Sequence, residues 1–183
     1  MEVYVHFICK IVVINSSKDT RSPDEVLNTH DGVQFPCLKV DHISRCIIEE
    51  SFCNADIVAV DEAQFFSNLK EFVEMCLFLD KSVIIAGLDG DYQQKKFGEI
   101  LDCIPMASDV VKLSALCMDC CNGTPGPFTK RIVKSDALEL VGGTDMYKAV
   151  CRTHLIETVD VQNKNHSFLK SALHDSVVSR VVK

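Results

Sequence analysis

Apolar residues in this chain occur in short runs with polar segments between them. Residues 10–15, 57–60 and 82–86 are rich in valine and isoleucine, which is typical of strands buried in a parallel sheet. The segment before the last run repeats apolar residues at nearly helical spacing, at Leu69, Phe72, Val73, Cys76, Leu77 and Leu79. A strand, a helix and a strand over this distance form a βαβ unit, whose strands are expected to be parallel with a right-handed crossover. The pattern therefore predicts an α/β domain.

Other segments carry weaker signals of regular structure. Residues 46–52 predict a short helix, residues 97–103 predict another, and residues 110–113 predict a further strand. Residues 16–22 and 30–35 are expected to form loops.

The character of the sequence changes at Cys117. A Cys-x-x-Cys pair, a stretch rich in glycine and proline and a Cys-x-x-His pair predict a small, loop-rich unit. Beyond His154 the chain is polar and mixed, with a weak amphipathic pattern near its end. We therefore predict an α/β domain over residues 1–116, a small zinc-binding domain over residues 117–155 and a tail over residues 156–183.

Composition narrows the class of protein. The 183 residues can form one domain or one domain with a small module, and a net charge of −7 argues against nucleic-acid binding through a general positive field. The net charge does not exclude binding of a small anionic ligand, because such a ligand needs only a few local cations. Residues 1–7 lack the basic and apolar regions of a signal peptide, and no apolar run is long enough to span a membrane. The ten cysteines are therefore expected to be thiols or metal ligands in a reducing, intracellular setting.

Three of these cysteines and one histidine form two closely spaced pairs, Cys117 with Cys120 and Cys151 with His154. Each pair can supply two ligands from one tight turn, and two such turns can complete a tetrahedral zinc site. The alternative is that the residues have this spacing by chance in a cysteine-rich chain. Cys121 directly follows the first pair, so the exact set of ligands stays open. We favour structural zinc, because the small unit has little apolar core of its own and a metal would stabilise it.

Two adjacent carboxylates, Asp61 and Glu62, follow the apolar run at residues 57–60. A parallel strand would bring them to the carboxyl edge of the sheet, where α/β proteins bind their ligands. One could hold a metal ion and the other could take a proton, although the pair could also simply cap a turn. Such a strand commonly occurs in nucleotide-phosphate enzymes together with the loop G-x-x-x-x-G-K-[ST], which this sequence does not contain.

Two further groups of residues have equally open interpretations. Aromatic residues after the run at 82–86 could form the wall of a base-binding pocket or belong to the core. Lys18, Asp19 and Arg21 follow the first predicted strand and could contact phosphate. Local sequence alone favours an exposed charged loop for these three.

Taken together, the motifs closely resemble those of the zinc-containing cytosolic type of thymidine kinase. The matching segments are Lys18-Asp19-Thr20-Arg21, Thr29-His30-Asp31, Asp61-Glu62-x-Gln64-Phe65-Phe66, Leu88-Asp89-Gly90-x-Tyr92-Gln93-x-Lys95-x-Phe97-Gly98, Val111-Lys112-Leu113, Cys117-Met118-x-Cys120, Phe128-Thr129-Lys130-Arg131, Gly142-Gly143-x-Asp145-x-Tyr147 and Val150-Cys151-Arg152. They cover about residues 10–155, in order and with nearly the family's spacing. An ordered set of this kind is highly specific.

The resemblance implies a P-loop-type α/β domain, a small zinc domain and a loop that folds over the thymine base. It implies transfer of the γ-phosphoryl of ATP to thymidine with Mg²⁺, in the cytosol, by a homotetramer with no nucleic-acid or membrane partner. Glu62 matches the family's general base, and Asp61, Asp19 and Arg21 match the magnesium and phosphate side. Residues at positions that match substrate contacts are Phe65, Leu88, Tyr92, Phe97, Phe128, Leu138, Leu140, Gly142 and Tyr147.

Three departures from the family pattern qualify this expectation. The family begins with a strand, a glycine-rich Gly-Lys-Ser/Thr loop and a helix, whereas this sequence starts at the equivalent of the second strand. The stretch at residues 123–127 is longer and richer in glycine and proline, and Lys96 replaces a common proline. Because the glycine-rich loop binds the triphosphate, the alternative expectation is a catalytically inactive relative that acts as a zinc-containing binding or assembly subunit.

Overall fold

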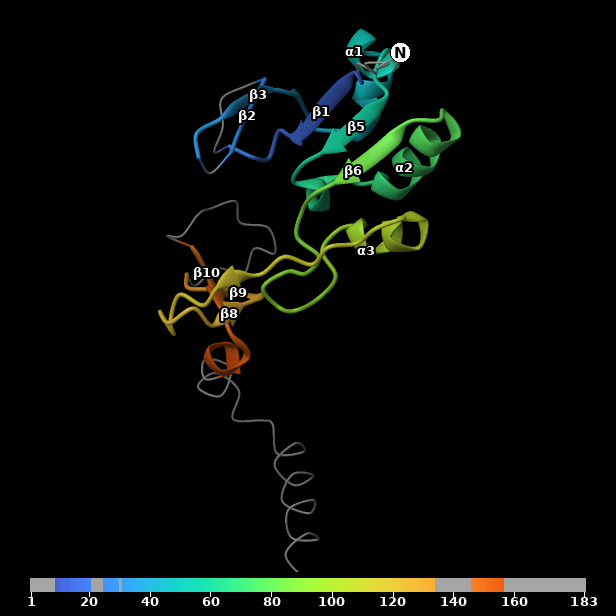
Figure 1. Ribbon diagram of the computed structural model, residues 1–183. Helices are drawn as coiled ribbons and strands as arrows, with labels where there is room; N and C mark the ends of the chain where they lie inside the picture. The colour runs from blue at the N-terminus through green and yellow to red at the C-terminus, as the bar shows by residue number, and fades with distance from the viewer. Residues whose placement is uncertain (1–8, 21–24, 30, 134–145, 157–183) are drawn as a thin grey trace, which may run out of the picture. The chain divides into compact units, whose positions relative to one another are not determined.

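The computed structural model describes residues 9–20, 25–29, 31–133 and 146–156 (Figure 1). The described residues divide into two compact units, the first ending at residue 112 and the second beginning at residue 113. None of the helices in these ranges has the length and apolar character needed to cross a lipid bilayer.

The first unit is built on a parallel sheet of four strands in the order β4-β1-β5-β6. The strands are β1 (Ile11–Ser16), β4 (Leu38–Val40), β5 (Ile57–Val60) and β6 (Ser82–Ile85). In register, Val12 of β1 lies beside Val58 of β5, which lies beside Val83 of β6. The predicted α/β class and the parallel pairing of β5 with β6 are confirmed.

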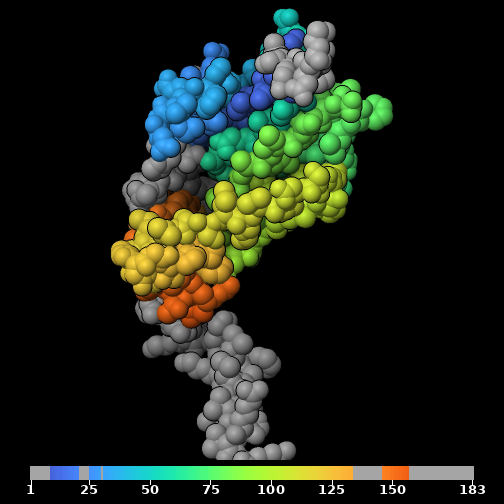
Figure 2. Space-filling model, viewed as in Figure 1, coloured from blue at the N-terminus to red at the C-terminus, as the bar shows by residue number. Residues whose placement is uncertain are grey.

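The position of each strand in this order explains its burial. Val58 and Val60 of β5 are almost completely buried, because β5 has a hydrogen-bonded neighbour on each side. The strand β6 lies at the edge of the sheet, and its Ile84 is 58% exposed. In Figure 2 the green atoms of this region lie at the surface of the first unit. Val83 and Ile85, on the other face, are only half-buried, so the sequence prediction of a buried strand is wrong for β6, although the strand itself forms.

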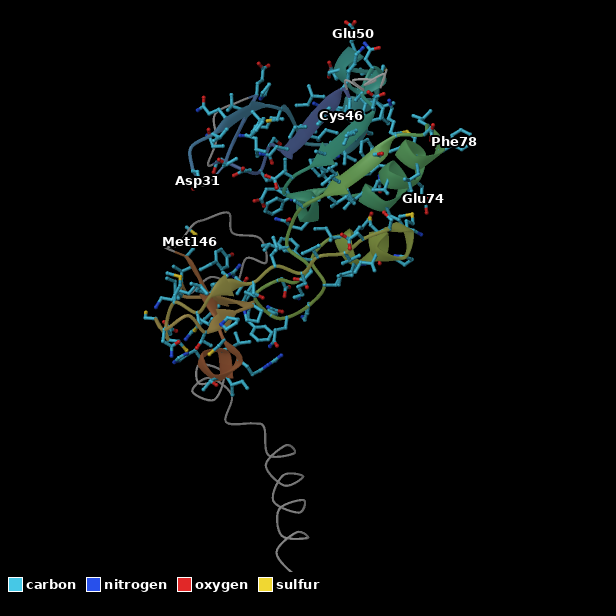
Figure 3. All side chains as sticks on the ribbon, viewed as in Figure 1. Asp31, Cys46, Glu50, Glu74, Phe78 and Met146 are labelled. Carbon is cyan, nitrogen blue, oxygen red and sulfur yellow. The ribbon has the colours of Figure 1, made fainter. Side chains whose placement is uncertain are left out.

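Helix α2 (Leu69–Phe78) connects β5 to β6 and confirms the helical spacing of its apolar residues. Its buried side is formed by Leu69, Phe72, Val73 and Cys76. The ring of Phe72 packs on Phe52, with 5.7 Å between the ring centroids. By contrast, Phe78 at the end of the helix points outward in Figure 3 and is 89% exposed.

Several weaker sequence predictions are only partly right. The helix expected at 46–52 is a 3₁₀ segment η1 (Ile43–Ile48) followed by α1 (Glu50–Cys53). The helix expected at 97–103 is reduced to α3 (Ile100–Cys103), which continues into η3 (Ile104–Met106). Three further short segments complete the regular structure of this unit: η2 (Ala63–Phe65), β2 (Val26–Asn28) and β3 (Gln34–Pro36).

Two other predictions are wrong in part or entirely. The end of the loop expected at 30–35 belongs to a hairpin, in which β3 pairs with β2 and Gly32 turns the chain with φ of 79°. The strand expected at 110–113 does not form, and these residues have no regular structure and are exposed. Apolar residues alone did not make a strand there, because a strand needs a hydrogen-bonded neighbour and no described strand pairs with this segment.

The second unit contains two short antiparallel pairs. One pair joins β7 (Ala115–Leu116) to β8 (Pro125–Gly126), and the other joins β9 (Phe128–Arg131) to β10 (Tyr147–Val150). Among its described residues, the buried side chains of its apolar cluster are Cys117, Val150 and Leu155. A unit with so few buried side chains needs another source of stability.

Candidate functional site

The carboxyl ends of the parallel strands place two acidic residues at one edge of the first unit's sheet. Asp61 directly follows β5, and its backbone N–H donates to the carbonyl of Ile14 in β1 at 2.9 Å. The next residue, Glu62, has φ of 50° and ψ of 37°, in the left-handed region that most residues avoid. The chain therefore turns sharply at Glu62, which is half-buried.

A buried amide, Gln64, holds the side chain of Glu62. The Nε2 of Gln64 donates to Oε2 of Glu62 at 2.6 Å, and its Oε1 accepts the backbone N–H of Leu88 at 3.0 Å. The turn after β5 is also joined to the end of β6, because the N–H of Ala63 donates to the carbonyl of Ala86 at 3.0 Å. Hydrogen bonds thus connect the segments that follow β5 and β6 next to the carboxylate of Glu62.

A second polar cluster lies at the end of β1. Asn15 is fully buried, and its Nδ2 donates to Oδ2 of Asp19 at 3.1 Å while its Oδ1 accepts the N–H of Ser16 at 2.7 Å. Asp19 is only 3% exposed, so it does not belong to the exposed loop that local sequence favoured. Burial raises the pKa of the Cys37 thiol, and the nearby carboxylates of Asp61 and Asp19 raise it further.

Sequence reasoning did not assign a site role to Asn15, Ser16 or Gln64. Asn15 and Ser16 lie at the end of an apolar run that the sequence placed in a buried strand, whereas Gln64 lies four residues beyond such a run. Buried polar side chains need hydrogen-bond partners, so a polar residue at the end of a core strand was the available signal.

Aromatic rings lie beside the acidic turn. The rings of Phe65 and Phe97 meet edge to face, with 5.6 Å between centroids, and Nζ of Lys18 lies 5.5 Å from the centroid of Phe65. A tight turn in the loop after β6 brings Phe97 back, because Asp91 accepts the N–H groups of Gln93 and Lys95 on its side chain. These aromatic residues are half-buried, as a ligand-facing wall would be.

Tyr92 and Leu88 belong to the same loop region. The hydroxyl of Tyr92 accepts a hydrogen bond from Nε2 of Gln93 at 2.8 Å, and Leu88 is 47% exposed. Lys112 forms an ion pair with Asp89 at the start of the loop, and Lys96 pairs with Asp102. The residue that replaces the family's common proline therefore ties the loop to α3.

The four residues predicted to bind zinc come together in the second unit. Nδ1 of His154 lies 3.5 Å from the sulfur of Cys117 and 3.4 Å from those of Cys120 and Cys151, and the latter two sulfurs are 3.8 Å apart. A tetrahedral zinc with ordinary bond lengths requires about 3.8 Å between two sulfurs and about 3.5 Å between sulfur and nitrogen. The donor set therefore fits zinc, and among the described residues it is the group arranged to hold a metal.

The protonation of these four ligands is uneven. Burial opposes ionisation of Cys117, but backbone N–H groups around its sulfur and the ring of His154 outweigh burial and lower the pKa of this thiol to about 6. Burial raises the pKa of Cys120 to about 11. Hydrogen bonding to Cys117 and then to Cys151 raises the pKa of His154. A bound divalent cation would favour the thiolate form of all the cysteines and the neutral form of the imidazole.

The hairpin of β9 and β10 connects to the metal-binding turns. Oδ1 of Asp119 accepts from Nζ of Lys148 at 3.1 Å, and Nζ of Lys130 donates to the carbonyl of His154 at 3.2 Å. At the other end of the hairpin, Nη2 of Arg131 donates to the hydroxyl of Tyr147 at 2.8 Å. The metal ligands and the strands thus support each other.

The predicted substrate contacts divide between the two units. Phe65, Leu88, Tyr92 and Phe97 lie in the first unit, and Phe128 and Tyr147 lie in the second, where Arg152 stacks 4.1 Å from the centroid of Phe128. The other predicted site residues, Arg21, Leu138, Leu140 and Gly142, lie outside the described residues.

Comparison with known proteins identifies the family. A model of the thymidine kinase family matches residues 2–155. The chain is 40% identical to a thymidine kinase of Oryza sativa subsp. japonica over 151 residues, which are 80% of this chain and 55% of the relative. It is 39% identical to thymidine kinase a of Arabidopsis thaliana over 179 residues, 93% of this chain and 71% of the relative. The chain belongs to the thymidine kinase family.

A third relative is the cytosolic thymidine kinase of Cricetulus griseus, 38% identical over 153 residues. The match covers 84% of this chain and 63% of that protein. The chain therefore spans between 55% and 71% of the length of these three relatives. The resemblance inferred from the motifs is therefore confirmed at the level of the thymidine kinase family, with a cluster of three cysteines and one histidine suited to zinc.

Proposed function

We propose that this protein is a thymidine kinase that transfers the γ-phosphoryl of ATP to the 5′-hydroxyl of thymidine, which makes dTMP for DNA precursor salvage. The observation that carries the proposal is the carboxylate of Glu62, held by a buried amide at the carboxyl edge of the sheet in a chain of this family. A general base must be held in an orientation that suits the proton it accepts, and the hydrogen bond from Gln64 restricts the orientation of this carboxylate.

The proposed step balances as a displacement at phosphorus. The carboxylate of Glu62 accepts the proton of the 5′-hydroxyl, the 5′-oxygen forms a bond to the γ-phosphorus, and the bond to the β-phosphate oxygen breaks to release ADP. Mg²⁺ bound with ATP would offset the negative charge of the phosphates, and Asp61 and Asp19 are the candidates to hold it, with Arg21 toward the phosphates.

The base of thymidine is proposed to lie against the aromatic wall of Phe65, Tyr92 and Phe97, with Leu88 beside it. Phe128, Leu138, Leu140, Gly142 and Tyr147 are proposed as further contacts to the substrate, because they match substrate-contacting positions of the family. Zinc at the four clustered ligands would be structural, because a site with four protein ligands leaves no open position for substrate.

Glu62→Gln is the direct test of the proposed chemistry. The variant is made in the polypeptide preceded by a family-type strand, Gly-Lys-Ser/Thr loop and helix. Its amide cannot accept the proton, so we expect a loss of about 100-fold or more in thymidine phosphorylation, while thymidine binding by calorimetry stays within about threefold. Gln34→Met, at an exposed position of β3, should change neither. Turnover by Glu62→Gln at the wild-type rate would remove Glu62 from the mechanism.

A second candidate function is a catalytically inactive, zinc-containing binding or assembly subunit. The 183 residues contain no G-x-x-x-x-G-K-[ST] motif, so the two candidates are separated by an experiment that supplies this motif. We expect a polypeptide of these residues to show no appreciable turnover, and the same polypeptide preceded by a family-type strand, Gly-Lys-Ser/Thr loop and helix to phosphorylate thymidine. Activity of the unextended polypeptide would reject the second candidate.

Specificity for thymidine is tested separately from turnover. A closed pocket can discriminate one methyl group by about 1–3 kcal/mol, and the base edge of deoxycytidine has the opposite pattern of donors and acceptors. Zinc-loaded protein should therefore bind thymidine more tightly than deoxycytidine in calorimetric titrations. Equal affinity for both nucleosides, or binding of neither by folded protein, would contradict the proposed pocket.

Location and assembly follow from the family as proposals. We propose a cytosolic homotetramer with no nucleic-acid or membrane partner, supported by the relative named as cytosolic and by the net charge of −7. Light scattering of the purified protein measures the oligomer directly, and a monomeric mass across the micromolar range would contradict the tetramer.

A further inference from the structure

Gln64 is a buried polar residue in the middle of an apolar region. Only 3% of it is exposed, and it follows Ala63, which is fully buried. Both ends of its amide are used, since Nε2 donates to Glu62 and Oε1 accepts from Leu88. The N–H of Leu88 can only donate, so the oxygen of the amide must face it and the NH₂ group must face the carboxylate.

Two glycines allow other segments to pack closely on Gln64. A Cβ atom at Gly87 would lie 2.4 Å from the side-chain Oε1 of Gln64, and one at Gly98 would lie 2.4 Å from the main-chain carbonyl oxygen of Gln64. Real Cβ atoms do not approach oxygen so closely, so any other residue at either position would displace Gln64. The segment after β6 therefore packs on the amide, and the segment before α3 packs on the backbone of the same residue.

The carboxylate of Glu62 needs such a partner. The residue lies in the left-handed region on a short turn, and a glutamate side chain has several rotatable bonds. A hydrogen bond of 2.6 Å to an ionised carboxylate is of the strong, charge-assisted kind, and its donor is buried and enclosed. The donor thus selects one orientation of the carboxylate among many.

We propose that Gln64 is a positioning residue, which fixes the Glu62 carboxylate relative to Leu88 at the end of β6. This inference rests on the kinase function proposed above, where Glu62 accepts the proton and Leu88 lines the pocket. One rigid amide then sets the distance between the catalytic base and the wall of the substrate pocket. Gln64 touches neither the substrate nor the reacting atoms in this role.

The first test measures the order of the Glu62 side chain by NMR relaxation of its methylene groups in the 183-residue chain. Gln64→Met keeps the shape of the side chain but cannot donate, so we expect a marked fall in the order of Glu62 and faster exchange of the Leu88 amide hydrogen. Val73→Ala destabilises the core of the same unit without touching Glu62, and Gln34→Met makes the same change at an exposed position. Unchanged order of Glu62 in Gln64→Met, or an equal fall in Val73→Ala, would overturn the proposal.

The second test is a double-mutant cycle in the version of the protein that phosphorylates thymidine. Gln64→Met should lower kcat by about 10- to 100-fold with little change in KM for thymidine, because misplacement of a catalytic group acts mainly on the chemical step. In the Glu62→Gln background the same change should cost less than about twofold, since the group that it positions is already disabled. Full additivity of the two losses would overturn the proposal.

The two tests separate this inference from the proposed function. If no version of the protein phosphorylates thymidine, the kinase proposal fails, yet the order of Glu62 still shows whether Gln64 holds it. If the protein is an active kinase and Glu62 keeps its order without Gln64, the positioning role fails alone.

Discussion

The two units of this molecule are stabilised in different ways. Among the described residues, the first unit buries fifteen apolar side chains in one cluster, whereas the cluster of the second unit has three, one of which is Cys117 of the four residues suited to hold a metal. Burial of apolar surface is spread over many residues, so each contributes part of the stability. A metal site concentrates the stability in a few bonds, so one ligand can decide whether the unit folds.

The largest expected effect is on the second unit, when one of its four candidate metal ligands is removed. Cys120→Ser removes a ligand from a site whose binding free energy, about 10–16 kcal/mol in zinc-finger peptides, is also folding free energy. We expect zinc content to fall from one per chain to well below one, and the amide signals of the second unit to lose their dispersion while those of β1 and β5 are unchanged. Elemental analysis and NMR measure both.

Cys121→Ser is the matched control, because Cys121 is exposed and its sulfur donates to the carbonyl of Met118 outside the ligand cluster. This variant should keep one zinc per chain. Wild-type protein with much less than one zinc, purified without chelator, would show that the second unit does not depend on metal.

The next largest effect is a loss of stability in the first unit, with no change expected in the second unit. Phe72→Ala removes a ring that is 4% exposed and packs on Phe52, so we expect a loss of about 3–5 kcal/mol in the free energy of unfolding. Phe78→Ala, on the same helix but 89% exposed, should change this free energy by less than about 0.5 kcal/mol. Urea unfolding followed by signals of the sheet measures the difference.

Zinc content provides the comparison with the second unit in this experiment. It should stay at one per chain in both phenylalanine variants. If Phe72→Ala also released zinc from the folded second unit, the two units would not be independent in stability.

A smaller effect, the difference between two glycine variants, measures how tightly the first unit is packed near the proposed site. Gly32 and Gly98 both have positive φ, so Gly→Ala at either position should cost about 1–2 kcal/mol of strain. A Cβ at Gly98 would also press on the carbonyl of Gln64, whereas nothing lies within 4 Å of one at Gly32. We expect Gly98→Ala to lose a further 1–3 kcal/mol, roughly, from overpacking. Equal losses in thermal or urea unfolding would mean that the backbone relaxes around Gln64.

The smallest effect compares ion pairs in the two units. The carboxylate of Asp119 pairs with both Lys148 and Lys130, and the hydrogen bond from Lys148 lowers the pKa of this carboxyl. Lys148→Gln should therefore lower the thermal midpoint of the second unit slightly. Lys70→Gln, which breaks an exposed pair with Glu74 in α2, should cost less than about 0.5 kcal/mol. A larger effect at Lys70 than at Lys148 would contradict the supporting role of the hairpin.

The sequence by itself determined the α/β class, three of the four sheet strands, the main helix and the four Cys and His residues that cluster in a group suited to zinc. These features depend on local periodicity and on the spacing of ligands in tight turns, which a single chain displays directly. The apolar spacing of residues 69–79 was enough to define α2, and the two closely spaced pairs were enough to identify Cys117, Cys120, Cys151 and His154.

Only the tertiary structure decided the rest. Residues 110–113 have a strand-like composition but no partner strand, and β6 has the composition of a buried strand but lies at an edge. The contacts of Gln64 join residues 62 and 88, which no local pattern connects. The buried bond of Asn15 to Asp19 corrects the exposed interpretation of that loop for Asp19, whereas Lys18 is exposed as expected. Pairing, burial and hydrogen-bond partners depend on which segments meet in space, and a linear pattern does not contain that information.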